Sequence, residues 1–211
     1  MGRIGKVTRE KIVEVATVLM HEHGYLGMSL EDVAKRLGIT RPALYYYYSR
    51  KDELLLDIHK RARTRIVSMA SDLYQQDFEP IEFYYRYLYN HCLVVTEHAP
   101  VISIMFDDAR HLSPEEKGRI SRQERESLGH LTETYQIIQK DGYFRDDTEA
   151  RLAVVTMLGA CNWIARWFKP GMWSPEYVAN STASNLVRGV ATIDGLDLLA
   201  SLNLMENTEF L

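Results

Sequence analysis

The sequence predicts an all-α fold, and three observations support this prediction. Apolar residues recur every three or four positions along most of the chain, the period of a helix with one buried face. Alternating Val/Ile/Thr runs are absent, so neither Asp-Gly pair, at 141–142 or 194–195, joins two predicted strands as a hairpin turn. Helix start signals, a Ser or Thr followed by proline or an acidic residue, punctuate the chain instead. The 211 residues, 46% of them hydrophobic, suffice for a buried core.

Four helices are expected in the first third of the chain, each bounded by residues suited to a helix end. Gly24 stops the first helix, and Ser29 begins the second with an acid three residues later. Gly38 ends that helix, and Thr40 caps the third with Pro42 in its first turn. The expected ranges are 8–23, 30–38, 41–47 and 50–73.

Five more helices are expected in the rest of the chain. Pro80, Pro100, Pro114 and Pro175 each stand where a first helical turn tolerates a missing N–H group. The expected ranges are 80–98, 100–111, 114–140, 146–168 and 174–192. The tail from Asp194 has weak start signals and is left unassigned. We expect two domains, residues 1–55 and residues 56–211.

Charge is distributed unevenly between the two parts of the chain. The overall formal charge is −4, but residues 1–65 hold 13 Lys or Arg and 8 Asp or Glu, a net charge of +5. Residues 66–211 hold 12 and 21, a net charge of −9. Such asymmetry indicates that the N-terminal part binds nucleic acid, although the average charge alone argues against it.

Several classes of protein are disfavoured by the sequence. Cys92 and Cys161 lack the spacing of a zinc site or a disulfide framework. GxSxG, P-loop, HExxH and GxGxxG motifs are absent, so we expect no enzyme, no metal and no cofactor. The chain lacks a signal-peptide pattern, and its longest apolar stretch, 152–168, is interrupted by polar residues. We therefore expect a cytoplasmic protein that does not bind membranes.

Residues 29–48 have the spacing of a helix-turn-helix. Val33, Ala34 and Leu44 form its inner face, so the third helix presents its other face outward. That face carries Arg41, whose planar fork of donors suits guanine or phosphate. The tyrosines 45–47 cannot all be buried because they span most of the helix circumference. Tyr48, four residues after Leu44, is expected in the core.

Two more basic features are candidates for phosphate contacts. Lys51 lies in the first turn of the next helix, where a cation is favourable if an anion docks. The N-terminal arm carries Arg3, Lys6, Arg9 and Lys11, which can attract DNA without reading its sequence. A short helical hairpin also occurs in folds that do not bind DNA, and a helical module whose tyrosines contact protein is the alternative.

Residues 8–57 resemble the DNA-binding domain of the TetR family of bacterial repressors. The matching run is Leu44-Tyr45-Tyr46-Tyr47-Tyr48-Ser49-Arg50-Lys51-Asp52-Glu53-Leu54, with Tyr48 where Phe is usual and Tyr47 where His is frequent. The resemblance implies a double-stranded, pseudo-palindromic DNA operator. The candidate DNA-binding residues are Ser29, Thr40, Arg41, Pro42, Ala43, Tyr45, Tyr46, Tyr47 and Lys51.

In that family the C-terminal helices bind a small-molecule effector and form a homodimer. Aromatic residues and methionine line adaptable pockets well, although each one alone is more often a core residue. The candidate ligand-binding residues are Tyr84, Tyr85, Leu88, Cys92, Met105, Phe106, Tyr135, Asn162, Trp163, Arg166 and Trp167.

Asn162 and Arg166 share a helix face, because they stand four residues apart. Their partner is either a ligand or a structural group such as Asp107 or Asp108. The run 162–171 is similar to a segment of TetR-like regulators of lipid, steroid and aromatic-acid catabolism, some of which respond to acyl-CoA thioesters. This similarity implies an acyl-CoA effector; a regulator that senses multiple drugs or aromatic compounds is the alternative.

The last helices carry small and apolar residues that suit pairing with a second subunit. The candidate dimer-interface residues are Leu158, Gly159, Leu186, Val187, Gly189 and Val190. A symmetric dimer would present two recognition helices about 34–36 Å apart, in successive major grooves. We expect ligand binding to shift this spacing and release the repressor from DNA.

Overall fold

The computed structural model describes residues 7–204 and confirms the predicted all-α class. Within this range no strand forms, and one isolated antiparallel bridge joins Phe144 and Ala191. No helix in residues 7–204 combines the length and apolarity needed to cross a membrane. The helices are α1 (Arg9–Gly27), α2 (Leu30–Leu37), α3 (Arg41–Tyr45), α4 (Lys51–Tyr74), α5 (Pro80–Glu97), α6 (Ala99–Asp107), the 3-10 helix η1 (Ala109–His111), α7 (Pro114–Lys140), α8 (Ala150–Trp167), α9 (Pro175–Arg188) and α10 (Ile193–Ser201).

The described residues divide into two compact units. The first contains residues 7–64 and 100–117, and the second contains residues 65–99 and 118–204. The first unit thus includes α6 and η1, although these follow α5 in the chain. The boundary predicted at residue 55 separates a DNA-binding part from a ligand-binding part, whereas these units are defined by how compactly the chain packs. The predicted boundary stays a prediction.

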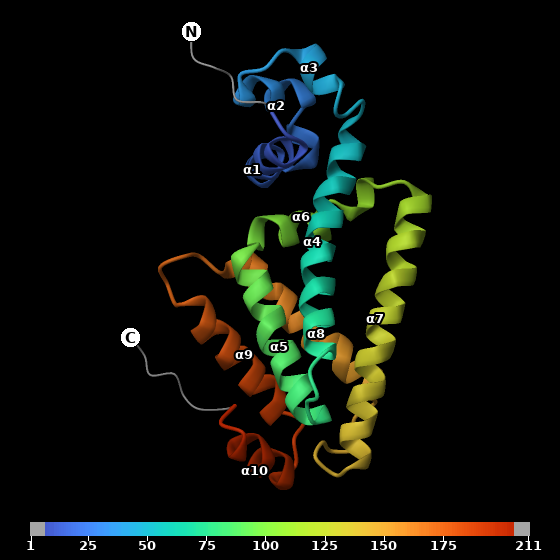
Figure 1. The fold of residues 1–211 in the computed structure, drawn as a ribbon, viewed down its shortest axis with the longest axis vertical. Coiled ribbons are helices and arrows are strands. Elements are labelled where there is room, and N and C mark those ends of the chain that lie inside the picture. Colours follow the sequence, from blue (N-terminus) through green and yellow to red (C-terminus); the bar gives the residue numbers. More distant parts are fainter. Residues whose placement is uncertain (1–6, 205–211) are drawn as a thin grey trace. The chain divides into compact units, whose positions relative to one another are not determined.

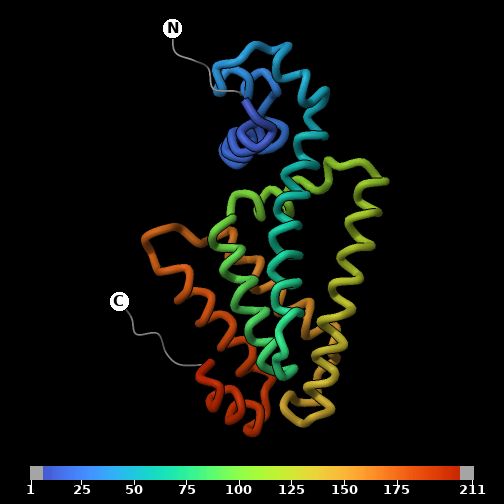
Figure 2. The backbone as a smooth tube through the Cα atoms, in the orientation of Figure 1, coloured from blue at the N-terminus to red at the C-terminus, as the bar shows by residue number. Residues whose placement is uncertain are grey.

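The first unit is built around α1 to α3 and the start of α4. Figure 2 shows the course of the backbone through these elements. Helix α2 packs against α1 and α3. The buried side chains include Ile12, Ala16, Val33, Leu44 and Ile58, which recur at helical spacing as predicted. Burial of these residues fixes how α3 is oriented within the unit.

Helix α1 contains a sharp break at Gly24. This residue has φ 72° and ψ 165°, a backbone region open almost exclusively to glycine. The predicted stop at Gly24 therefore marks a real interruption, but the chain resumes one further helical turn that ends at Gly27. This extra turn places the carbonyls of Tyr25 and Met28 beside α4.

The second unit is centred on α5, which lies side by side with α8 and α9 (Figure 1). Its core joins aromatic and sulfur-containing side chains from several helices, among them Tyr84, Tyr135, Phe144 and Cys161. Aromatic rings from α5, α7 and the loop after α7 contact one another at centroid distances of 4.9 to 5.7 Å. This region is the interior of the helices that the sequence predicted for the second part of the chain.

The structure differs from the expected helix bounds at several places. The helix expected from residue 146 begins at Ala150, after its cap Glu149, and the one expected over 100–111 ends at Asp107, before η1. Helix α3 ends at Tyr45 instead of about Tyr47, because the next residues form a tight turn into α4. Helix α9 ends at Arg188, four residues early. The unassigned tail forms α10, whose cap Thr192 accepts a hydrogen bond from the Gly195 N–H and donates one to the Gly142 carbonyl. That carbonyl lies 50 residues away, so a local pattern could not reveal the cap.

Candidate functional site

The helix-turn-helix is held in shape by its own polar side chains. Ser29 accepts from the Asp32 N–H at 3.2 Å, and Asp32 Oδ2 accepts from the Ser29 N–H at 2.9 Å, the capping box that the spacing predicts. Gly38 takes the left-handed conformation of the turn, with φ 68° and ψ 29°. Thr40 then caps α3 by accepting from the Ala43 N–H. The predicted residues Ser29 and Thr40 thus define the ends of two helices.

On the outward face of α3, Arg41 and Tyr45 form an ordered cluster with Glu31 of α2. An Nη atom of Arg41 lies 2.7 Å from Glu31 Oε1 and 3.3 Å from the Tyr45 hydroxyl, which itself donates to Glu31. The guanidinium also lies over the Tyr45 ring, 5.2 Å from its centroid. These contacts orient Arg41 while leaving its side chain 65% exposed.

Tyr46 follows as the C-cap of this short helix and is 85% exposed. Pro42 and Ala43 are exposed beside it. An aromatic side chain this exposed contributes little to folding, and its ring and hydroxyl are free to meet base methyl groups or phosphates. Arg41, Pro42, Ala43, Tyr45 and Tyr46 are therefore all exposed along α3 and its C-terminal end.

Tyr47 and Tyr48 face the protein. The Tyr47 hydroxyl donates to the Val7 carbonyl at 2.8 Å. Tyr48 is buried, as predicted, and donates to Asp57 at 2.7 Å while Arg9 donates to it. Burial is the main cause that raises the pKa of Tyr48 to about 12. Arg9, predicted to attract DNA, thus also anchors the first unit; Arg3 and Lys6 of the same arm lie outside the described residues.

Lys51 has a task that the sequence did not predict. Its ammonium donates to the carbonyls of Tyr25 at 2.6 Å and Met28 at 2.9 Å, and lies 4.3 Å from the Tyr25 ring centroid. The phosphate contact expected of Lys51 stays a prediction, because an ammonium has three N–H donors and two of them are used by these carbonyl acceptors. They lie 23 and 26 residues away, which is why local spacing missed them.

The predicted ligand-binding residues fall in two places. Met105 and Phe106 belong to α6 in the first unit, and Phe106 is about half exposed. In the second unit the structure brings five of them into the interior: Tyr84, Tyr85, Leu88, Cys92 and Tyr135. Trp163, Arg166 and Trp167 point outward from α8, so they do not line that interior.

Asn162 joins the interior through a residue that the sequence analysis did not select. Its Oδ1 atom lies 2.8 Å from Nε2 of His91, which is buried on α5. The signal was present, because His91 lies seven residues after Tyr84 and so on the same helix face. The buried thiols of Cys92 and Cys161 are hydrogen-bonded to each other, which raises the pKa of Cys92. The interior thus contains neutral polar groups among aromatic rings.

The predicted dimer-interface residues have different surroundings. Gly159 and Gly189 are exposed, and Leu158, Leu186 and Val190 are half-buried. Val187 is fully buried in its own chain, so its side chain cannot reach a second subunit. Helix α8 also carries an exposed stripe of Leu152, Val155 and Trp163, the last 64% exposed. The prediction did not include Leu152 and Val155, and it assigned Trp163 to the ligand-binding site.

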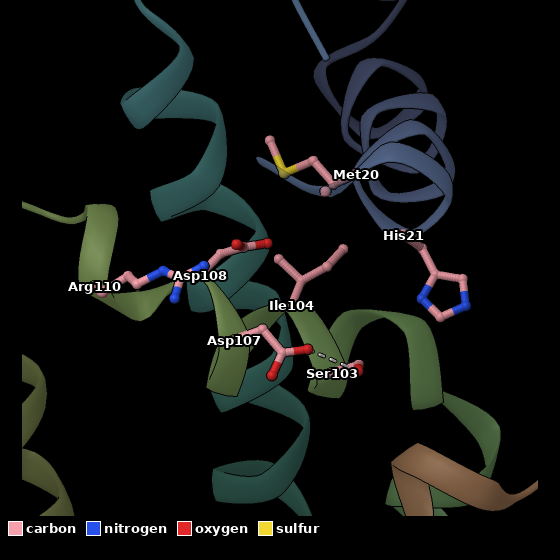
Figure 3. A pocket seen from close by; sticks show the side chains of 8 residues that line it. Met20, His21, Ser103, Ile104, Asp107, Asp108 and Arg110 are labelled. Carbon is pink, nitrogen blue, oxygen red and sulfur yellow. Dashed lines mark hydrogen bonds between the residues drawn. The ribbon is translucent and has the colours of Figure 1, made fainter. Parts of the chain in front are cut away.

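A cavity of about 370 Å³ lies in the first unit, between the end of α1 and α6. Figure 3 shows Met20 and His21 on one side and Ser103, Asp107 and Asp108 on the other. Burial raises the pKa of Asp108. Near this cavity the ring of His111, in η1, stacks on Tyr25 at 4.5 Å. The α6–η1 segment is thus packed against the turn that holds Lys51.

Two family models match this chain. The model for "Bacterial regulatory proteins, tetR family" matches residues 12–58, which contain the helix-turn-helix. The model for "Tetracyclin repressor-like, C-terminal domain" matches residues 79–190, more than half of the chain. Between them they cover both the exposed face of α3 and the interior around His91.

Individual relatives agree with these models. The transcriptional repressor KstR2 of Mycobacterium tuberculosis is 21% identical over 165 residues, which are 77% of this chain and 82% of that protein. The TetR-family regulator PfmR of Thermus thermophilus has a TM-score of 0.76 at 28% identity, covering 84% of this chain and 97% of its own. AibR, solved with isovaleryl coenzyme A and operator DNA, has a TM-score of 0.76 at 23% identity and covers 85% and 97%.

Proposed function

This chain belongs to the TetR family of bacterial transcriptional regulators, and from that premise we propose that it is a homodimeric repressor released from its operator by an acyl-CoA thioester. Membership places it among DNA-binding regulators with a helix-turn-helix, and not among enzymes. The operator contacts, the dimer and the effector are the proposed parts.

The exposed face of α3 carries the DNA-binding part of the proposal. Arg41 is oriented by Glu31 and Tyr45, so little side-chain entropy remains to be lost when it meets a base. Arg41 is suited to the O6 and N7 atoms of guanine, and Tyr46 to a thymine methyl or a phosphate. Ser29, Thr40 and Tyr47 support this face from the helix ends and the following turn.

The exposed stripe of α8 supports a dimer. Leu152, Val155 and Trp163 lie on one face with Gly159 between them, so a second helix can approach closely. A two-fold symmetric pair would bury this stripe on both subunits. Such symmetry would match the two half-sites of a pseudo-palindromic operator.

The α6–η1 segment supports the coupling between effector and operator. It belongs to the first unit and contacts α1 through the Tyr25–His111 stack, yet it connects α5 to α7, which carry Tyr84 and Tyr135 of the interior. A ligand that moves α5 or α7 would thus also move α6 and η1, and through His111 the turn at Tyr25 that contacts Lys51. Coupling of this kind is typically worth about 1–3 kcal/mol.

Two observations favour a thioester effector. AibR, a similar regulator, was solved with isovaleryl coenzyme A, and the run 162–171 resembles that of regulators responsive to acyl-CoA. The aromatic interior of Tyr84, Tyr135 and Phe144 also suits a free aromatic compound, which is the second candidate effector.

The test starts from an operator fragment selected by the purified protein from a random DNA library. Arg41→Ala is expected to weaken binding to this fragment by about tenfold or more, because a base contact is lost. Arg119→Ala, which removes the same charge from an exposed site on α7, is the matched control. Equal footprints for Arg41→Ala and the unsubstituted protein would show that α3 does not read the operator.

Salt and effector titrations complete the test. If the protein makes several phosphate contacts, its affinity for the operator fragment falls steeply as salt rises. A protein-binding module would not bind the fragment in this salt-dependent way. Adding thioesters of graded acyl length to the DNA complex is expected to release the protein. Release by free aromatic compounds alone would select the second candidate effector.

A further inference from the structure

The interior of the second unit contains a connected set of buried polar side chains. Tyr84, Tyr87 and His91 lie on one face of α5, since they are spaced by three and four residues. The Tyr87 and His91 rings stack at 5.9 Å, and Tyr84 meets Tyr135 of α7 edge-on at 5.7 Å. Buried polar groups destabilise the fold unless they are hydrogen-bonded, so each of them must be accounted for.

The hydrogen bond between His91 and Asn162 fixes the state of the imidazole. Asn162 Oδ1 can only accept, so Nε2 of His91 must carry the proton. Burial lowers the pKa of His91, so the ring is neutral at physiological pH and Nδ1 keeps its lone pair. Nδ1 is therefore a hydrogen-bond acceptor that faces the interior.

Two polar atoms of this interior have no partner within residues 7–204. They are Nδ1 of His91 and the hydroxyl of Tyr135. The nearby Tyr84 hydroxyl reaches only the thioether sulfur of Met157, a weak acceptor, at 3.4 Å. Leaving a buried polar atom unpaired costs about 1–3 kcal/mol, so a ligand group that pairs with one gains that amount.

The interior is also free of charge. Among the described residues of the second unit, no Lys, Arg, Asp or Glu side chain is buried. A carboxylate or phosphate inside would therefore lack a counter-ion and lose its hydration. The part of an effector that enters must be neutral, as the acyl portion of a thioester is.

We propose that His91 is a specificity-determining residue, which selects an effector whose acyl portion carries a hydroxyl group that donates to Nδ1. A carbonyl group cannot serve at this atom because it has no proton to donate. The Tyr135 hydroxyl, which can donate, suits a carbonyl of the ligand. Asn162 is a positioning residue that holds the tautomer. The inference rests on the proposed function and names the substrate class.

The experiment compares thioesters of one chain length on the full-length protein bound to its selected operator fragment. The probes are decanoyl-CoA, 3-oxodecanoyl-CoA, 3-hydroxydecanoyl-CoA and 10-hydroxydecanoyl-CoA. One of the two hydroxyacyl thioesters is expected to release DNA at a concentration about tenfold or more below that of decanoyl-CoA. The difference is expected because only the hydroxyacyl compound pairs with the buried acceptor Nδ1. His91→Phe keeps an aromatic ring against Tyr87 and is expected to bring the ratio between the two thioesters to about one.

A second measurement does not depend on a variant that folds. In the ¹⁵N spectrum of the unsubstituted protein, the unprotonated Nδ1 resonance of His91 is expected to shift towards a hydrogen-bonded value with the active hydroxyacyl thioester and not with decanoyl-CoA. Equal release by all four thioesters, or stronger release by the 3-oxo compound, overturns this inference and leaves the proposed function standing. If no thioester releases DNA, the proposed effector class fails, and the inference fails with it.

Discussion

Tyrosine has opposite roles in the two units. In the first, Tyr45 and Tyr46 stand exposed on α3 beside Arg41, and their partners lie within fifteen residues. In the second, Tyr84 and Tyr135 are buried among aromatic rings, and Tyr84 reaches a partner 73 residues away. An exposed surface of this kind suits a charged, hydrated partner such as DNA, whereas the ligand proposed for the interior would have to be neutral there.

The largest expected effect tests whether burial separates the two groups of tyrosines. Tyr84→Ala is expected to lower the free energy of unfolding by about 3–5 kcal/mol, because it leaves a cavity among Tyr135 and Phe144. Tyr46→Ala is expected to change that energy by less than about 0.5 kcal/mol while weakening operator binding. Urea denaturation followed by circular dichroism measures the free energy of unfolding of both variants. Similar losses for the two variants would break the comparison.

The second effect tests whether burial acts in the same way inside the first unit. Burial lowers the pKa of His59 to about 4, from an ordinary value of 6.5. The unfolded chain therefore binds a proton more readily than the folded one between these two values, and stability falls as pH drops below about 6.5. The full difference amounts to about 3 kcal/mol at pH 4.

The matched control for this pH effect is His59→Gln, which removes the titrating group but keeps a polar side chain. Denaturant melts between pH 7 and pH 4.5 should show a smaller acid loss in this variant than in the unsubstituted protein. A parallel loss in both proteins would mean that His59 does not titrate on unfolding. His91, whose pKa burial also lowers, adds an acid loss that the variant retains.

A third, smaller effect concerns the connection between the surface and the interior. His111→Ala removes the ring that stacks on Tyr25 and is expected to leave operator affinity nearly unchanged. The effector concentration for half-release should rise, at most by the roughly 5- to 150-fold that is typical of allosteric coupling. His23→Ala, on the exposed side of α1, is the control. Unchanged release in His111→Ala would place the coupling elsewhere.

The smallest effect separates a free surface from a dimer surface. Gly118 in α7 and Gly159 in α8 both have room for a Cβ atom within their own chain. Gly118→Ala is expected to raise stability by about 0.5–1 kcal/mol through helix propensity. Gly159→Ala should instead weaken the dimer, as measured by sedimentation at low protein concentration. A tighter or unchanged dimer would exclude Gly159 from the interface.

The sequence predicts what is encoded locally. Ser29 with Asp32, Gly38 and Thr40 define the helix-turn-helix within twelve residues, and Leu44 with Tyr48 predicts the buried face of α3. These signals are strong because each cap satisfies backbone groups of its own helix.

The sequence does not predict partners that only folding brings together. Lys51 pairs with the carbonyls of Tyr25 and Met28, and His91 pairs with Asn162 across 71 residues. Trp163 belongs to a helix rich in apolar residues on several faces, so its pattern could not tell an interior side chain from an exposed one. Helix packing decides both questions, and single-helix periodicity contains no information about it.

The break at Gly24 has a consequence for how this protein can vary. Its backbone angles exclude other residues, and the turn that follows supplies the two carbonyls that hold Lys51 at the start of α4. In a genetic selection for cells that have lost repression, substitutions at Gly24 should therefore be recovered alongside those of Arg41. Substitutions at Gly24 are therefore not tolerated during evolution, even though no atom of Gly24 needs to touch DNA.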